Sequence, residues 1–115
     1  MRDINICVIV TGKTLPEFLR NLKRVQKVAD FVELRVDYIK DLKPADVSVI
    51  REQTTRCAIF TCRRQKEGGR FAGSEKERLE IIYAALKCNF DYLDLELAAI
   101  GNLDRSRVRI GRAHV

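Results

Sequence analysis

Histidine is almost absent from this chain, and cysteine occurs without the spacing that metal sites use. The single histidine, His114, is the second-last residue, and the four cysteines, Cys7, Cys57, Cys62 and Cys88, form no CxxC pair. Metal binding is therefore not expected. Each cysteine lies in or beside an apolar segment, which favours reduced core thiols over disulfides.

Long apolar runs and low-complexity runs are also missing. No stretch approaches the roughly 20 apolar residues of a membrane span, so no membrane partner is expected. The opening MRDINICVIV is too short and too polar for a secretory signal, which makes a cytoplasmic location the expectation. The 115 residues are 46% hydrophobic and 33% charged, which is typical of one small folded domain.

An even spread of positive charge is lacking too. The net charge is +6, but residues 104–115 hold four arginines against one aspartate, a net of +3 in the tail alone. The rest of the chain has no basic stripe interleaved with aromatic residues and no nucleic-acid-binding motif. Nucleic acid is therefore not an expected partner, although residues 105–112 leave it open as a third alternative.

What the chain does contain is an alternation of strand and helix patterns. Four segments rich in Val, Ile, Phe, Tyr or Leu predict strands at 4–10, 31–37, 57–62 and 91–97. Helices are predicted from Thr14 and Ser74, each followed three residues later by glutamate in a capping-box pattern, and at 44–53. The helix after Ser74 is expected to bury Leu79, Ile82 and Leu86. This β-α-β-α-β-α-β order favours a parallel sheet with right-handed crossovers.

Two of the predicted strands carry charge on one face. Alternation places Glu33, Arg35 and Asp37 together in the second strand, and Asp94 and Glu96 together in the fourth. Central strands of a doubly wound sheet should be apolar on both faces. A barrel, with the charged face toward its interior, explains both strands and is favoured over a wet edge strand.

The chain is too short for a whole barrel of this kind. A complete (βα)8 barrel needs roughly 200–250 residues, whereas four strands are visible and residues 98–115 show no clear strand–helix continuation. The predicted fold class is therefore α/β, a parallel half-barrel of about four βα units. In such a fold the loops after the strands build the site, which accounts for the charge in FTCRRQKEGGRF (60–71).

Four segments together resemble one enzyme family. They are ICVIVTGKT (6–14), ADFVELRVDYI (29–39), IFTCRRQKEGGRFAGSEKERL (59–79) and DYLDLEL (91–97). In these segments the chain is similar to type I 3-dehydroquinate dehydratase of the shikimate pathway. The resemblance implies a barrel enzyme without metal or organic cofactor that dehydrates 3-dehydroquinate to 3-dehydroshikimate. It also implies a lysine that forms an imine with the substrate and a histidine that moves protons.

Carried over by motif, the resemblance implies that Glu33, Arg35 and Arg63 bind substrate, and that Glu67 orients Arg63 or a substrate hydroxyl. Arginine suits the carboxylate of the substrate, and carboxylates suit its hydroxyls. The alternative for Glu33 and Arg35 is an internal ion pair. For Arg64, Lys66 and Arg70 a solvated loop is favoured, and for Asp94 and Glu96 a structural role.

The chain departs from the family pattern in two ways. Ile9 stands where some members have a substrate-contacting serine, so one hydroxyl contact is missing or comes from Thr11. The family's histidine and imine lysine are expected to lie beyond residue 115, and neither His114 nor the lysines Lys13 and Lys66 are expected to replace them. We therefore expect no catalytic residue here and no activity from this chain alone.

These points lead to a domain assignment and a partner. Residues 1–98 are predicted to form the N-terminal half of the barrel, and residues 99–115 a divergent basic tail. A half-barrel has two unpaired edge strands, which two copies would cover as a homodimer. The alternative to a truncated dehydratase is a non-catalytic half-barrel that serves as a binding or interaction module.

Overall fold

Four parallel strands form one sheet, in the same order in space as in the chain. The computed structural model describes residues 6–108. The strands are β1 (Cys7–Val10), β2 (Phe31–Arg35), β3 (Cys57–Thr61) and β4 (Tyr92–Asp94), and each pairs in parallel with the next. The predicted parallel sheet and its four βα units are therefore confirmed.

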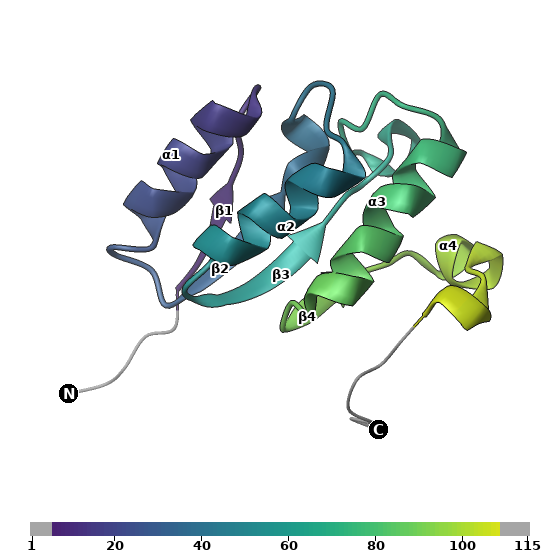
Figure 1. The fold of residues 1–115 in the computed structure, drawn as a ribbon. Coiled ribbons are helices and arrows are strands. Elements are labelled where there is room, and N and C mark those ends of the chain that lie inside the picture. The colour runs from purple at the N-terminus through teal and green to yellow at the C-terminus, as the bar shows by residue number, and fades with distance from the viewer. Residues whose placement is uncertain (1–5, 109–115) are drawn as a thin grey trace.

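One helix follows each of the first three strands, and all three helices cover the same face of the sheet (Figure 1). They are α1 (Leu15–Val25), α2 (Pro44–Gln53) and α3 (Glu75–Cys88). Right-handed crossovers between sequential neighbours place every helix on one side. A doubly wound sheet would reverse direction and carry helices on both sides, so this is the arrangement of a barrel segment.

Of the two predicted capping boxes, the one at Ser74 is complete and the one at Thr14 is half formed. The Ser74 hydroxyl accepts from the Glu77 amide at 3.1 Å, and the Glu77 carboxylate accepts from the Ser74 amide at 2.7 Å, which completes a capping box. At α1 the Thr14 hydroxyl accepts from the Glu17 amide at 3.2 Å, but Glu17 accepts in return from Lys13 rather than from Thr14. Both helix starts therefore satisfy amides that have no partner within the helix.

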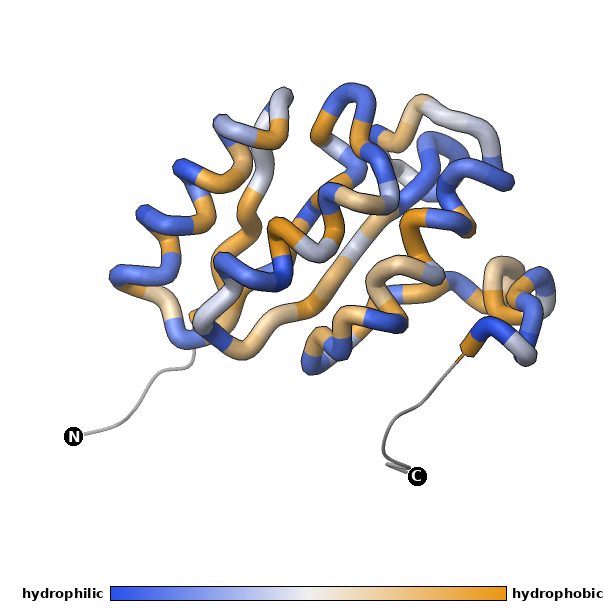
Figure 2. The backbone as a smooth tube through the Cα atoms, viewed as in Figure 1, coloured by the Kyte–Doolittle hydropathy of each residue, from blue (hydrophilic) through white to orange (hydrophobic). Residues whose placement is uncertain are grey.

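The core fills the space between the helices and the sheet. The apolar sides of the helices turn toward the strands, and the hydrophilic sides turn outward (Figure 2). Phe60 of β3 is fully buried there, and its ring centroid lies 5.0 Å from that of Phe90. Other fully buried strand and helix residues of this layer include Val10, Phe18, Leu22, Val32, Leu34, Val47, Ile50, Ala58 and Ile81.

The opposite face of the sheet carries no helix. Ile9 of β1 and Tyr92 of β4 lie on it with exposed fractions of 55% and 58%, and Cys7 and Cys57 are exposed. All four cysteines are free thiols, but only Cys62 is buried, so the expectation of core thiols holds for one of them. No helix in the described part of the chain is long and apolar enough to cross a membrane.

The second and fourth strands end earlier than predicted. β2 stops at Arg35, and residues Val36–Tyr38 form a 3₁₀ turn that buries Asp37. β4 stops at Asp94, and Glu96 becomes the N-cap residue of a short helix, α4 (Leu97–Asn102). Asp37 and Glu96 therefore do not continue the strand alternation that was expected of them.

The described part of the C-terminal segment folds back onto α3. The Arg107 guanidinium donates to both Glu80 carboxylate oxygens at 2.8 and 2.9 Å and lies 3.9 Å from the Tyr83 ring centroid. The Tyr83 hydroxyl accepts from the Asp104 amide at 2.7 Å. α4 runs across the predicted boundary at residue 98, and that division stays a prediction. Residues 109–115, with His114, lie outside the described residues.

Replacing Phe60 with alanine tests the packing of the helices on the sheet. We expect Phe60→Ala to lower the free energy of unfolding by about 3–5 kcal/mol, because it removes a fully buried ring and leaves a cavity. Val28 is 82% exposed, so Val28→Ala should change stability by less than about 0.5 kcal/mol. Urea unfolding followed by circular dichroism measures both. Equal effects of the two variants would contradict the packing described.

Candidate functional site

Charged side chains gather where the strands end at their carboxyl termini. Glu33 and Arg35 come from the uncovered face of β2, Arg63 follows β3, and Asp94 ends β4. The register places Arg35, Thr61 and Asp94 side by side on three neighbouring strands. Of the four residues predicted to bind substrate, Arg35 and Arg63 therefore lie at the end of the sheet where barrel active sites form, and Glu33 lies two residues earlier on the same face of β2.

Arg35 is held by a buried carboxylate. Its Nε and Nη2 donate to Asp37 Oδ1 and Oδ2 at 3.0 and 2.9 Å, and the Asp37 side chain is fully buried. The hydrogen bond with Asp37 raises the pKa of the Arg35 guanidinium above its ordinary value. This paired fork fixes the direction of the guanidinium and leaves its remaining donors for a ligand.

The same carboxylate holds the loop that follows β3. Asp37 Oδ2 also accepts from the Arg70 amide at 2.9 Å. The Tyr38 ring lies beside both arginines, with the guanidinium carbons of Arg35 and Arg70 each 5.3 Å from its centroid. Asp37 thus joins the end of β2 to residues 63–73. Arg70, expected in a solvated loop, is exposed but takes part in this stack.

Glu33 takes a hydroxyl partner rather than an arginine. Its Oε2 accepts from the Thr61 hydroxyl at 2.9 Å across the β2–β3 pair. Arg35 is paired with Asp37, so the described contacts do not include the internal Glu33–Arg35 ion pair that was the alternative interpretation. The register places Glu33 beside Ile9 and Ile59, on the uncovered face of the sheet.

Arg63 and Asp94 form an ion pair at the solvent edge of the cluster. Arg63 Nη2 donates to Asp94 Oδ2 at 2.7 Å, and the two side chains are 38% and 39% exposed. This hydrogen bond raises the pKa of Arg63 above its ordinary value. The pair joins the β3 loop to the last residue of β4, and both groups remain open to solvent.

Glu67 lies farther from this cluster than expected. It ends a 3₁₀ turn (Gln65–Glu67), and its carboxylate lies 3.4 Å from Arg64 rather than against Arg63. Orientation of Arg63 is therefore not the contact that Glu67 makes, and the substrate hydroxyl is left as its predicted partner. Arg64 also lies 3.9 Å from Glu75.

Two glycines let this loop turn back on itself. Gly68 has a φ of +80°, a conformation that side chains disfavour. Gly69 packs so closely that an added Cβ would lie 2.0 Å from the Arg63 carbonyl oxygen. The Phe71 amide donates to the same oxygen at 3.1 Å. The backbone that carries Arg63 is therefore clamped, and only the side chain is free to move.

A fully buried arginine supports the cluster from behind, and sequence analysis missed it. Arg78 of α3 donates to Glu75 at 2.9 and 2.8 Å, to the Cys62 carbonyl at 2.8 Å, and to Glu96. The hydrogen bond with Glu75 is the main cause that raises the pKa of Arg78. Cys62 precedes Arg63 and Glu96 caps α4, so Arg78 fixes the ends of β3 and β4.

The buried side of α3 is rotated by about one residue from the predicted one. The structure buries Arg78, Ile81, Ile82 and Ala85, whereas Leu79 and Leu86 are only partly buried. Positions 78, 81, 82 and 85 fit helical spacing equally well. The sequence could have indicated the burial of Arg78 through this alternative helical spacing and through Glu75, a possible ion-pair partner three residues earlier.

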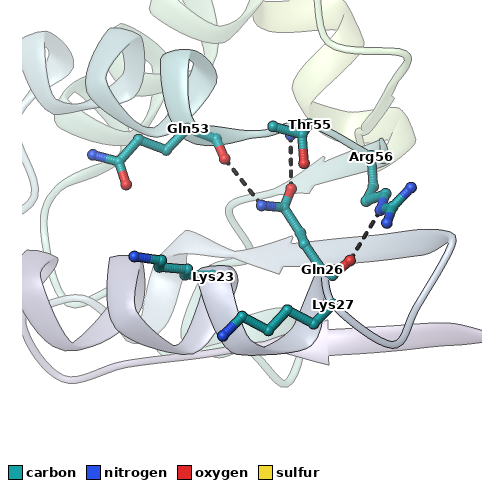
Figure 3. A pocket seen from close by; sticks show the side chains of 6 residues that line it. All are labelled: Lys23, Gln26, Lys27, Gln53, Thr55 and Arg56. Carbon is teal, nitrogen blue, oxygen red and sulfur yellow. Dashed lines mark hydrogen bonds between the residues drawn. The ribbon is translucent and has the colours of Figure 1, made fainter.

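A pocket lies away from this cluster, at the other end of the sheet. It is lined by Lys23, Gln26, Lys27, Gln53, Thr55 and Arg56 (Figure 3). The Gln26 side-chain amide donates to the backbone carbonyl of Gln53 at 3.0 Å and accepts from the backbone amide of Thr55 at 2.7 Å. The Arg56 guanidinium donates to the backbone carbonyl of Gln26 at 3.0 Å. These contacts join the ends of α1 and α2, and none involves the strand-end cluster.

The strand-end cluster suits a small polar anion rather than a metal. Among residues 6–108 no group of three or more His, Cys, Asp or Glu side chains could hold a metal ion. The guanidinium groups can bind a carboxylate, and the carboxylates can accept from hydroxyls. The exposed lysines Lys13 and Lys66 lie in loops after β1 and β3.

Comparisons with known proteins point to one family. The family model described as type I 3-dehydroquinase matches residues 6–114. A 3-dehydroquinate dehydratase of Coxiella burnetii is 46% identical over 92 residues, which cover 80% of this chain and 40% of that protein. The bifunctional 3-dehydroquinate dehydratase/shikimate dehydrogenase of Arabidopsis thaliana is 30% identical over 103 residues, 88% of this chain and 17% of that protein.

A solved structure supports the same assignment. The crystal structure of 3-dehydroquinate dehydratase from Geobacillus kaustophilus matches with a TM-score of 0.70 and 28% identity, over 84% of this chain and 41% of that one. The chain therefore spans about 40% of the length of the single-function relatives that it matches.

Removal of the buried arginine tests how the cluster is supported. We expect Arg78→Met to lower the free energy of unfolding by about 2–4 kcal/mol, because the Cys62 carbonyl loses its buried donor and Glu96 its partner. Arg64 shares Glu75 with Arg78 but is partly exposed, so Arg64→Met should cost less than about 1 kcal/mol. Chemical denaturation of both variants measures the difference, and similar losses would show that Arg78 is not the support described.

Proposed function

The chain belongs to the type I 3-dehydroquinase family, and we propose that residues 1–98 are the substrate-binding half of a 3-dehydroquinate dehydratase barrel, followed by a divergent basic tail at 99–115. The observation that carries this proposal is the position of Arg35 at the carboxyl end of β2 and of Arg63 after β3, with Glu33 two residues before Arg35 on the same face of β2. That is the end of a βα barrel where substrates bind. The uncovered face of the sheet would then line the barrel interior.

The substrate chemistry fits these groups. 3-Dehydroquinate carries one carboxylate and several hydroxyls. Arg35 and Arg63 offer planar donors to the carboxylate, while Glu33 and Glu67 offer acceptors to hydroxyls. Asp37 and Arg78 hold these groups in place without a ligand, so little ordering is needed on binding, which favours affinity.

We further propose that this chain alone binds substrate without turning it over. The family resemblance assigns imine formation to a lysine and proton transfer to a histidine, and it places neither at Lys13, Lys66 or His114. The chain would thus contribute the binding half of a hydro-lyase of the shikimate pathway, in the cytoplasm, and the Schiff-base chemistry would come from residues outside this sequence. A non-catalytic binding module would make the same contacts and is the second candidate.

Calorimetric titration with 3-dehydroquinate, paired with an absorbance assay for the enone product, tests this function. We expect saturable binding without turnover, and roughly a tenfold or greater loss of affinity in Arg63→Ala, because a charge-assisted hydrogen bond is worth about 1.5–3 kcal/mol. Arg107→Ala removes the same charge at a distance and should bind like the parent chain.

Two outcomes would contradict the proposal in different ways. Absence of binding by the parent chain would refute the substrate site. Turnover that survives repurification and is lost in Arg63→Ala would refute the assignment of catalysis to residues outside the chain.

The uncovered sheet face leads to a proposed homodimer. β1 and β4 are each paired on one side only within the described sheet. Ile9 of β1 and Tyr92 of β4 both expose apolar surface on the uncovered face. Two copies related by a two-fold axis would pair β1 of one with β4 of the other and cover both faces.

Light scattering at micromolar concentration tests the dimer. We expect twice the 13.2 kDa chain mass, and a shift to monomer in Ile9→Lys, since a buried unpaired charge would oppose association. Val28→Lys places the same charge on a residue that is 82% exposed in the turn after α1 and should leave the mass unchanged. A monomeric parent chain would refute the dimer.

A further inference from the structure

The two arginines of the proposed substrate site are held by their carboxylate partners to very different degrees. Arg35 and Asp37 share two hydrogen bonds, and their side chains are 12% and 0% exposed. Arg63 and Asp94 share one hydrogen bond, and their side chains are 38% and 39% exposed. Asp37 cannot leave Arg35 without stranding a buried charge, whereas Asp94 can turn into solvent.

The surroundings of Arg63 allow its partner to change. Its backbone is clamped by Gly69 and Phe71, so a change of partner needs only side-chain rotation. Asp94 is the last residue of the edge strand β4, and an exposed ion pair of this kind is weak. A guanidinium carries five N–H donors, and the contact with Asp94 uses one nitrogen.

Formal charge at the strand ends does not favour an anion while Asp94 is in place. Arg35, Arg63 and Arg70 supply three positive charges, and Glu33, Asp37 and Asp94 supply three negative ones. A ligand carboxylate that approaches Arg63 therefore meets a cluster without net charge and a carboxylate already on its target. Without the Asp94 charge the remaining groups carry a net charge of +1.

We propose that Asp94 is a resident counter-ion of Arg63 that an anionic ligand must displace, so that Asp94 sets the affinity and the anion selectivity of the site. The inference rests on the proposed function for the identity of the ligand, but the displacement itself concerns any small carboxylate. The opposite possibility is that Asp94 orients Arg63 toward the ligand. Displacement predicts that removing the Asp94 charge strengthens anion binding, whereas orientation predicts that it weakens it.

The measurement is a titration with acetate, the simplest carboxylate, followed by the Arg63 Nε–H signal in NMR spectra at low ionic strength. The signal is assigned by its loss in Arg63→Lys. Asp94→Asn keeps the shape and one acceptor but removes the charge. We expect it to tighten acetate binding at Arg63 by roughly two- to fivefold, the range that an exposed ion pair spans, and we expect this gain to disappear in high salt.

Glu80→Gln is the matched control. Glu80 pairs with Arg107 at 2.8 Å, and the side chains of Arg107 and Glu80 are 39% and 41% exposed, so the variant removes one charge from an equally exposed pair that shares no hydrogen bond with the cluster. It should leave acetate binding at Arg63 unchanged. A gain in both variants would mean that total charge, not Asp94, controls binding, and would overturn the proposal.

The remaining outcomes separate this inference from the proposed function. Weaker or equal acetate binding in Asp94→Asn, or no acetate binding at Arg63 in either protein, overturns the displacement. A gain for acetate without any binding of 3-dehydroquinate sustains the displacement and refutes the proposed substrate. A parallel gain for both ligands supports the two together.

Discussion

The candidate site depends on one buried carboxylate, that of Asp37. It accepts three hydrogen bonds, two from the Arg35 guanidinium and one from the Arg70 amide, and its side chain has no exposed surface. Removing the partner of a buried charge costs about 3–5 kcal/mol, so the Asp37 carboxylate keeps these partners. The Arg35 side chain and the β3 loop are therefore both anchored to Asp37. The end of β2 and the loop after β3 therefore behave as one unit, and this unit carries the residues proposed to bind substrate.

The rest of the cluster is built outward from this point with falling rigidity. Arg78 fixes the backbone of Cys62 and the carboxylate of Glu96 from beneath, and Gly69 allows the loop to close on Arg63. Arg63 and Asp94 come last, at the solvent edge. A rigid interior with one loosely paired arginine at its rim is an arrangement that can hold a small anion and still exchange it.

Sequence patterns were sufficient where the physics is local and insufficient where tertiary contacts decide. The capping box at Ser74 and the strand alternation at Glu33 and Arg35 depend on neighbours in the chain, and both were predicted. Alternation could not show that β2 ends at Arg35, because the turn that buries Asp37 is stabilised by Arg70, 33 residues away. Arg78 was missed because a charged residue is expected outside, and only its carboxylate and carbonyl partners explain its burial. The partner of Glu67 also differed: its carboxylate contacts Arg64, the N-cap residue of its own 3₁₀ turn, and not Arg63.

Hydrogen exchange at the Arg70 amide of the ligand-free chain tests most directly whether the site is built before substrate arrives. With Asp37 as its acceptor, this loop amide should exchange as slowly as the amides of β2, and Asp37→Asn should speed its exchange far more than that of the β2 amides. Exchange at the rate of an exposed loop amide in the parent chain would contradict the account, because the β3 loop would then be ordered by the ligand and not by Asp37.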